Sequence, residues 1–491
     1  MLKKLALLLP LCALMLSTAS AQTIRSFVTR PDRSALFAEQ EQQTEFSEQR
    51  NDRAPYIIID PHQSYQPIDG FGYALTGGSA EHLIRMSSKA RRSLLEALFD
   101  PEKGIGISCI RLTLGASDLN SFVFSYDDMP EGQEDFVLEH FSLAQDLHDV
   151  IPVMHEILAI NPRIQILSSP WSAPAWMKES KNVRGGRLRK ECYDVYADYF
   201  VRYIEAMREQ GIEIDAVTVQ NEPLNSRNTP SMPWSAAEQA EFVKNHLGPK
   251  FRAAGLPTGI IIFDHNCDRP DYALEIYNDP EAAQYLLGTA YHHYRGDLSA
   301  MSYVHEARPD KQLYFTEQMT TERPGTPRID IAAAVGRLII GITRNWSRNV
   351  VLWNLAADPN NDPHTDNGGC SMCQGAVTID GNEASYNLAY YVIAHASKFV
   401  RPGSVRIRST APGDRSMQLC EDEQRPGIFR ANVVACTDVP ANVAFRTPDG
   451  HIVLVVANDS WSRRTVHIQY EGRFATLALE PGAAATYVWK K

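Results

Sequence analysis

Short apolar runs alternate with amphipathic stretches over most of this chain. Each run is rich in β-branched or aromatic residues and has the length of a buried strand, whereas the stretches between runs carry apolar residues at helical spacing. One such stretch runs from Tyr193 to Gln210 and is followed by Gly211, a residue typical of helix ends. The eight runs contain Gly70, Ser108, Ile164, Ala216, Ile260, Thr289, Leu313 and Val350. Strand and helix units in such a series predict an α/β fold, a (β/α)8 TIM barrel over residues 68–400.

The pattern changes beyond about Ser397, where short alternating strands and turns replace the strand and helix units. Asp449-Gly450 lies between two apolar alternations, which is typical of a β-hairpin. We therefore predict a C-terminal β-sandwich over residues 401–491. The run at residues 56–67 is expected to join this sandwich, because the eight strands of the barrel are already accounted for.

The first 21 residues have the pattern of a cleavable signal peptide. Lys3 and Lys4 precede an apolar core from Leu5 to Leu16, and Ala19-Ser20-Ala21 is a small-residue cleavage pattern. The core is too short to span a bilayer, and no later run is a candidate membrane helix. We expect a secreted or periplasmic protein with no stable membrane insertion. Residues 22–55 are rich in Gln, Glu and Arg, which predicts a poorly structured lead-in.

Seven of the eight cysteines remain after the predicted cleavage, an odd number that leaves at least one free thiol or an intermolecular bond. Cys370 and Cys373 have the spacing of a zinc half-site, but no second pair of ligands follows at a suitable distance. They are expected to form a disulfide or to be loop thiols. Cys420 and Cys436 flank an irregular stretch and are candidates to close a loop in an oxidising compartment.

The balance of charge excludes one class of ligand. The formal net charge is −11 at pH 7 and the isoelectric point is near 5.7. Because phosphate binding needs clustered Lys and Arg, nucleic acid is not expected as the main partner. A neutral substrate fits this chain better.

Two glutamates close apolar runs at matching positions. Glu222 ends the run that starts at Ala216, and Glu317 ends the run that starts at Gln312. The carboxyl ends of barrel strands form the active-site face, and a pair of carboxylates there is suited to cleaving a glycosidic bond. For either glutamate alone, a solvated loop residue is the simpler interpretation. The pair favours catalysis, although these patterns do not assign which carboxyl group does what.

Several motifs resemble glycoside hydrolase family 30, the glucosylceramidase and β-1,6-glucanase family. They are Asp69 to Gly72, Ser169 to Trp176, Thr218 to Pro223, Phe315 to Glu317, and Trp353 to Leu355, and the resemblance extends from about Tyr56 to the C-terminus. The Ser-Pro-Trp run together with Asn-Glu-Pro is the specific part of this match. The resemblance implies a hydrolase that needs no cofactor and no metal.

The resemblance also implies a role for each catalytic carboxyl group. Glu222 is expected to be the general acid and base, and Glu317 the nucleophile of a double displacement that retains the anomeric configuration. Asn221 is expected to bond the sugar 2-hydroxyl and to hold Glu222. Arg111 is expected to keep Glu317 ionised through its opposite charge.

Six further positions complete the predicted substrate site. Tyr294 matches a position whose hydroxyl contacts the nucleophile, and we place its neighbour His293 among the substrate-binding residues. We interpret the pair His292-His293 as satisfied polar residues rather than a metal site. The flat faces of the indoles suit a pyranose ring, and the aligned polar residues suit its outer hydroxyl groups. The remaining predicted residues are Trp171 and Trp353, which stack, and Asp118 and Asn367, which bind hydroxyl groups.

One departure from the family bears on the substrate. Thr76 to Ser79 replaces an acidic segment of the human-type glucosylceramidases and is similar to the bacterial β-1,6-glucanase members. We therefore expect a secreted retaining hydrolase of β-linked glucose that cleaves β-1,6-glucan. The alternatives are a glucosylceramidase or an exo-acting β-glucosidase.

A non-catalytic carbohydrate-binding protein on the same scaffold is an alternative from another class. The presence of both Glu222 and Glu317 argues against it, because a binding module needs neither. A sugar-binding surface on the sandwich is compatible with an enzyme. Lone Trp461 and Trp489 are weak evidence for such a surface.

Overall fold

A computed structural model describes residues 22–51, 54–322, 326–422, 425–436 and 438–491. The predicted signal peptide lies outside these residues and stays a prediction. Within the described part of the chain, every helix is too short or too polar to cross a membrane.

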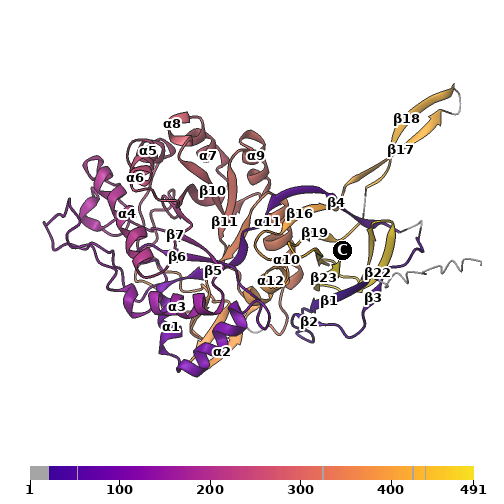
Figure 1. The fold of residues 1–491 in the computed structure, drawn as a ribbon, viewed down its shortest axis with the longest axis horizontal. Helices are drawn as coiled ribbons and strands as arrows, with labels where there is room; N and C mark the ends of the chain where they lie inside the picture. The colour runs from indigo at the N-terminus through magenta and orange to yellow at the C-terminus, as the bar shows by residue number, and fades with distance from the viewer. Residues whose placement is uncertain (1–21, 52–53, 323–325, 423–424, 437) are drawn as a thin grey trace, which may run out of the picture.

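Eight parallel strands form the sheet at the centre of the larger domain (Figure 1). Neighbouring strands are hydrogen-bonded to each other in the order β11, β10, β9, β8, β7, β6, β5 and β12. The two outer strands meet where the backbone N–H of Arg348 donates to Leu313 (2.9 Å) and that of Phe315 donates to the Asn349 side chain (2.8 Å). The predicted barrel is therefore confirmed. Its strands are β5 (Gly70–Leu75), β6 (Cys109–Thr113), β7 (Gln165–Ser169), β8 (Ala216–Thr218), β9 (Gly259–Cys267), β10 (Leu286–Gly296), β11 (Gln312–Glu317) and β12 (Asn349–Leu352).

The helices surround this sheet and bury their apolar stripes on it. In α4, Tyr196, Tyr199, Phe200 and Tyr203 recur at helical spacing, and all are fully buried. Two of the helical segments contain a π-helical turn, at 243–247 and at 336–341. The helices are α1 (Gly77–Arg85), α2 (Ser88–Phe99), α3 (Val150–Ile160), α4 (Tyr193–Glu209), α5 (Ala236–Phe242), α6 (Gly248–Ala253), α7 (Pro270–Tyr277), α8 (Pro280–Ala283), α9 (Ser299–Ala307), α10 (Ile331–Val335), α11 (Ile342–Arg344) and α12 (Leu388–Ser397).

A second, ten-stranded sheet makes up the smaller domain, where β4 lies between β16 and β21. Its apolar core contains Trp489, which is almost fully buried. The C-terminal β-sandwich predicted from the sequence is confirmed. Its strands are β1 (Thr23–Thr29), β2 (Ala38–Glu39), β3 (Thr44–Glu45), β4 (Tyr56–Pro67), β16 (Val405–Ser409), β19 (Ala441–Arg446), β20 (His451–Ala457), β21 (Arg464–Tyr470), β22 (Arg473–Leu479) and β23 (Ala484–Lys490).

Two smaller sheets complete the fold. One follows β12 and consists of β13 (Ala356–Ala357), β14 (Val377–Asp380) and β15 (Glu383–Tyr386). The other is the hairpin of β17 (Arg415–Asp422) and β18 (Arg425–Cys436), which projects away from the sandwich in Figure 1.

The expectation of a poorly structured lead-in over residues 22–55 is wrong for its first part. β1 pairs antiparallel with β23, with Arg25 opposite Val488, and Ile24 and Phe27 are buried. Because polar residues after β1 dominate the composition of this segment, its composition does not indicate the short strand β1. Its partner strand lies at the other end of the chain, so no local pattern indicates the pairing.

Polar contacts join the two domains. His395 on α12 is buried and bonds Thr486 on β23 and Thr29 on β1, each at 2.9 Å. The Arg344 side chain donates to the backbone of Ser409 (3.0 Å). The sandwich thus packs on one side of the barrel, and the strand ends that form the site lie outside this interface.

Candidate active site

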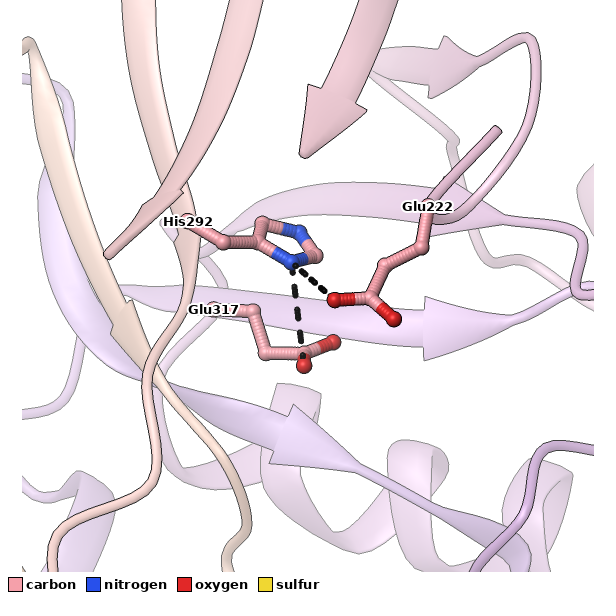
Figure 2. A group of neighbouring side chains, drawn as sticks. All are labelled: Glu222, His292 and Glu317. Carbon is pink, nitrogen blue, oxygen red and sulfur yellow. Dashed lines mark hydrogen bonds and ion pairs between the residues drawn. The ribbon is translucent and has the colours of Figure 1, made fainter. Parts of the chain in front are cut away.

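A polar cavity of about 580 Å³ lies at the carboxyl ends of the barrel strands. Glu222 and Glu317 line it, together with Asp118, Tyr294 and Trp353. Figure 2 shows the two glutamates and His292 pointing toward one another from separate segments of the barrel. One oxygen of Glu222 and one of Glu317 lie within 4.8 Å of each other. The sequence prediction that these two carboxylates share one site is consistent with this geometry.

The permanently charged Arg111 and the hydroxyl group of Tyr294 hold the carboxylate of Glu317. Arg111 on β6 is fully buried, and its Nη1 donates to Oε2 of Glu317 at 2.7 Å. The hydroxyl of Tyr294 donates to Oε1 at 3.1 Å. Both contacts match the roles expected for these residues, because each stabilises the ionised carboxylate.

Asp264 is a buried residue that the sequence interpretation missed. It accepts from Arg111 Nη2 (2.8 Å) and from the Thr218 hydroxyl (2.7 Å), and it faces His292 Nε2 (3.1 Å). Burial alone would raise the pKa of this carboxyl, but Arg111 and His292 hold it well below the usual range. The signal was present in the sequence, since Asp264 follows the apolar run of β9 as Glu222 and Glu317 follow theirs.

Glu222 lies on a strained backbone and has neutral or titratable partners. Its φ of 48° is in the left-handed region, which costs a non-glycine residue free energy and is often found at functional sites. Asn225 Nδ2 donates to Oε2 at 2.7 Å, and His292 Nδ1 lies 3.3 Å from Oε1. His265 Nε2 is 3.7 Å from the same oxygen.

Of the neighbours His292 and His293, it is His292 whose ring nitrogens face Glu222 and Asp264, whereas the sequence prediction named His293. Side chains of a strand alternate between its two faces, so only one of two neighbours can face the catalytic carboxylates. The register of β10 against β11 also shifts between Tyr291 and His292. The His293 side chain is outside the cavity, and burial together with the charge of Arg337 lowers its pKa.

The charges of the site set an unexpected order of proton affinities. Burial opposes a charge on His292, but the carboxylates of Glu317, Asp264 and Glu222 outweigh it and raise its pKa to about 9. Burial also opposes ionisation of Glu222, but His292 and Asn225 lower its pKa to about 2. The pKa of Glu317 is raised, because burial outweighs the cations His292 and Arg111. The surrounding carboxylates thus favour the charged form of His292, whose Nδ1 lies 3.3 Å from Glu222 Oε1.

Glu222, His292 and Glu317 also come close enough together to suggest a metal site. However, His292 has a carboxylate oxygen at both ring nitrogens, Asp264 at 3.1 Å and Glu222 at 3.3 Å. An imidazolium with a pKa near 9 has no free lone pair with which to bind a cation. The donor set fits a hydrogen-bonded proton network better than a metal site.

A stacked pair of tryptophans lies at one side of the cavity. Trp171 and Trp353 are stacked with ring centroids 5.3 Å apart, and the Arg111 guanidinium lies 4.8 Å from the Trp171 ring. Only Trp353 lines the cavity, whereas Trp171 supports it from behind. Asp118 also lines the cavity, and burial and the two glutamates raise its pKa to about 8.

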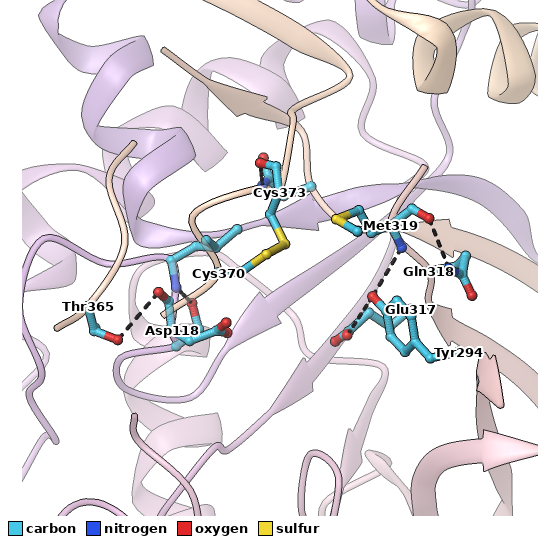
Figure 3. Close-up of a disulfide and its surroundings, with 11 residues drawn as sticks. Asp118, Tyr294, Glu317, Gln318, Met319, Thr365, Cys370 and Cys373 are labelled. Atoms are coloured by element: carbon cyan, nitrogen blue, oxygen red, sulfur yellow. Dashed lines mark hydrogen bonds between the residues drawn. A yellow bond between two sulfur atoms is a disulfide. The ribbon is translucent and has the colours of Figure 1, made fainter. Parts of the chain in front are cut away.

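A disulfide between Cys370 and Cys373 lines the same cavity. Figure 3 shows the disulfide with Asp118 and Met319 on either side of it in this view, and Glu317 lines the same cavity. Of the two alternatives for this pair, the structure has the disulfide. The side chains of Cys420 and Cys436 lie outside the described residues, so their predicted pairing stays a prediction.

Two predicted substrate residues, Asn221 and Asn367, do not line this cavity. Asn221 is buried beneath the cavity, where its Oδ1 accepts from Arg111 at 2.7 Å, so it contacts Arg111 rather than Glu222. Asn367 lines a neighbouring depression beside Phe122 and Arg184. Asn367 lies in the long segment between β13 and β14, and its predicted contact with substrate stays a prediction.

Comparison with known proteins identifies the family. The model of the glycosyl hydrolase family 30 TIM-barrel domain matches residues 68–400, and that of the family 30 beta sandwich domain matches residues 429–487. An endo-1,6-β-D-glucanase of Neurospora crassa is 35% identical over 367 residues, 72% of this chain and 75% of the relative. The lysosomal acid glucosylceramidase of Mus musculus is 26% identical over 464 residues, 89% of this chain and 83% of the relative.

Solved structures agree with this match. A structure of an endo-β1,6-glucanase superposes with a TM-score of 0.82 at 31% identity, covering 95% of this chain and 99% of the other. SrfJ from Salmonella typhimurium superposes with a TM-score of 0.84 at 26% identity, covering 96% of this chain and 100% of the other. On these matches the chain belongs to glycoside hydrolase family 30 and is a glycoside hydrolase.

Proposed function

We propose that this protein is a secreted retaining hydrolase that cleaves β-1,6-linked glucan. The observation that carries the mechanism is the approach of Glu222 and Glu317, whose nearest oxygens lie within 4.8 Å. Retaining glycosidases place their carboxyl groups about 5 to 5.5 Å apart, whereas inverting enzymes need about 6.5 to 9.5 Å to admit a water molecule. The closeness of this pair supports retention.

In the first step, a Glu317 carboxylate oxygen attacks the anomeric carbon while Glu222 donates a proton to the leaving oxygen. Arg111 and Tyr294 stabilise the charge of Glu317 before the attack. His292 Nδ1 lies 3.3 Å from Glu222 Oε1, so it is placed to supply the proton that Glu222 donates. Sugar binding between the two glutamates would favour that transfer by excluding water and separating their charges.

In the second step, Glu222 acts as the base. It takes a proton from a water molecule, whose oxygen attacks the anomeric carbon and breaks the bond to Glu317. The second displacement restores the β configuration. Glu222 then holds the proton needed for the next cycle, with His292 as its hydrogen-bonded partner.

Two features support β-1,6-glucan as the substrate. An endo-1,6-β-D-glucanase is among the relatives above 30% identity, and an endo-β1,6-glucanase is among the similar structures. In addition, Gly77 and Gly78 let neighbouring loops pack closely on α1. A Cβ on Gly77 would lie 2.0 Å from Asn120 Nδ2, and one on Gly78 would lie 2.6 Å from Pro363. A bulkier acidic segment here would displace the loop that carries Asp118.

Secretion is supported by the chemistry of the site as well as by the predicted signal peptide. Disulfides persist in oxidising compartments and are rare in a reducing cytosol. The Cys370–Cys373 disulfide is part of the cavity wall, so the oxidised form is the one that has the site described here. Fractionation of the producing cell, with the protein detected by antibody, tests this location. Recovery of the mature protein in the cytosol would contradict it.

Two measurements test the activity itself. Time-resolved NMR should find the β-anomer as the first product, and an α-anomer would refute retention. A panel of pustulan, laminarin, xylan, an aryl β-glucoside and glucosylceramide should give the highest kcat/KM on pustulan. Faster hydrolysis of glucosylceramide would favour the second candidate, a glucosylceramidase, for which the mouse relative is the supporting observation.

Rescue of activity by azide tests the roles proposed for Glu222 and Glu317. Glu222→Ala removes the base of the second step, so azide should restore turnover of an activated aryl glycoside and give the β-glycosyl azide. Rescue of a Glu317 variant with inverted product, without rescue of the Glu222 variant, would reverse the assignment.

A further inference from the structure

Trp461 is the most exposed large apolar side chain in the described part of the chain. Its side chain is 100% exposed, whereas Trp171, Trp353 and Trp489 are each 2% exposed or less. An indole in water presents a broad flat face that the fold itself does not use. Sugar rings bind to such faces through the C–H groups on one side of the pyranose.

The loop that carries Trp461 is fixed by a buried asparagine. Asn458 is 2% exposed, and its Nδ2 donates to the backbone of Ser462, Leu479 and Glu480, each at 2.9 Å. Its Oδ1 accepts from the Ser460 hydroxyl at 2.7 Å. The loop tip is therefore held in one conformation, and a ligand that stacks on Trp461 would not have to order it.

Grooves lie on both sides of Trp461. One has a volume of about 440 Å³ and the other about 630 Å³, and they share Pro31, Arg328, Trp461 and Pro481. We call these four residues and the space between them the Trp461 groove. Its walls are tied to each other, since the backbone N–H of Ile329 donates to Pro31 at 2.9 Å. Asp459 and Glu480 add polar groups at its edge that are able to bond sugar hydroxyl groups.

One chain connection links the Trp461 groove to the active site. Glu317 ends β11, Met319 lines the active-site cavity, and Thr321 and Glu322 line the smaller part of the groove. The backbone N–H of Glu322 donates to the side chain of Gln374 (3.1 Å), the residue after Cys373 of the cavity wall. The groove and the cavity share no lining residue, so they are separate sites on neighbouring surfaces.

We propose that the Trp461 groove is a second binding site for the glucan chain that the active site cleaves. This inference rests on the proposed function, because the occupant is taken to be the enzyme's own polymeric substrate. Trp461 stacks on a glucose ring while the polar rim bonds hydroxyl groups. The site holds the polymer on the enzyme and leaves the cleavage of short substrates unchanged.

Affinity electrophoresis tests this proposal. In the Glu317→Gln background, migration should be retarded in gels that contain pustulan, and Trp461→Ala should weaken this retardation about tenfold in apparent Kd. Tyr303→Ala is the matched control, because Tyr303 on α9 is also exposed (59%) and lies outside every cavity named above. Equal retardation of the Trp461 and Tyr303 variants would overturn the proposal.

Kinetics of the active enzyme give a second readout. Trp461→Ala should raise KM for pustulan while kcat/KM for an aryl β-glucoside stays at the value of the parent enzyme. Equal loss on both substrates would mean that Trp461 acts through the fold, and would overturn the inference. A change in oligomeric state by light scattering, without any change in retardation, would assign Trp461 to contact with a second copy and would also overturn it.

The substrate panel separates a failure of this inference from a failure of the proposed function. If the panel identifies another glucan as the best substrate, the β-1,6 assignment is wrong. The gel experiment then uses that glucan, and the difference between the Trp461 and Tyr303 variants still decides the role of the groove.

Discussion

Glu222 and Glu317, the two residues proposed to be catalytic, line one cavity and are held in different ways. Glu317 is at the end of β11 and receives an ion pair from Arg111, which Asp264 holds in turn. Glu222 has a left-handed backbone, and its partners are an amide and two histidines. The kinds of partner differ as the proposed roles differ, while burial raises the pKa of Glu317 and His292 lowers that of Glu222. A nucleophile keeps its charge and is suited by a permanent cation, whereas an acid and base exchanges a proton and is suited by a titratable neighbour.

The largest effect on activity is expected at Glu317, the glutamate that pairs with the permanently charged Arg111. Glu317→Gln removes the nucleophile and retains the shape of the side chain, so kcat/KM should fall by on the order of 10⁴-fold or more. Steady-state kinetics on an aryl β-glucoside measures this loss, and thermal unfolding checks that the variant is folded. A variant with substantial activity and a normal fold would show that Glu317 is not the nucleophile.

The next prediction concerns Asp264, which pairs with the same arginine, Arg111, that holds Glu317. Asp264→Asn removes a carboxylate from a fully buried ion pair with Arg111, and the loss of one partner from such a pair costs about 3 to 5 kcal/mol. Urea denaturation measures the free energy of unfolding. The control is Asp310→Asn, because Asp310 pairs with Arg308 at the surface, where an ion pair contributes about 1 kcal/mol or less. Equal losses in the two variants would contradict a special role for Asp264.

The pH dependence of stability tests His292, the titratable partner of Glu222. Burial opposes its charge, but the surrounding carboxylates raise its pKa to about 9, above the value of about 6.5 in an unfolded chain. A group with a raised pKa in the folded state contributes stability that is fully present below about pH 6.5 and is lost as the pH rises through about 9. The difference in unfolding free energy between the parent and His292→Phe should therefore shrink over this window. A difference that stays constant with pH would mean that His292 is neutral in the folded protein.

The smallest effect is expected at Trp353, which lines the cavity but is not one of the polar partners of Glu222 or Glu317 described above. Trp353→Ala removes the indole face that lines the cavity and should cost about 1 to 3 kcal/mol of transition-state binding. The ratio of kcat/KM values on a short β-1,6-linked substrate measures this cost. Trp461→Ala is the comparison variant, since it removes an indole outside the cavity. A larger loss for Trp461→Ala on the same short substrate would contradict the stacking role of Trp353.

The barrel and both glutamates could be predicted from the sequence because their signals are local. The strands coincide with short, mainly apolar runs, and Glu222 and Glu317 each close one, so neither prediction needs knowledge of distant contacts. Asp264 had the same signal, since it follows the apolar run from Ile260 to Phe263, but a single acidic residue there is also compatible with a solvated loop. Only its contacts with Arg111 and His292 reveal its role.

What could not be predicted depends on register and on long-range pairing. The assignment of His293 instead of His292 is an error of one position, and the register shift at this point of β10 has no sequence pattern. Asn367 lies in a loop without regular structure, where spacing along the chain does not determine position in space. β1 was missed because the strand that completes it is β23.

The pairing of β1 with β23 also fixes an order of events during folding. The whole barrel lies between these two strands in the sequence, so β1 cannot find its partner until nearly the entire polypeptide has been synthesised. Contacts between residues so distant along a chain form slowly, because the entropy of closing a long loop must be overcome first. The sandwich is consequently the domain that assembles last, and a chain interrupted before β23 leaves the edges of β1 and β20 open to pairing with other molecules.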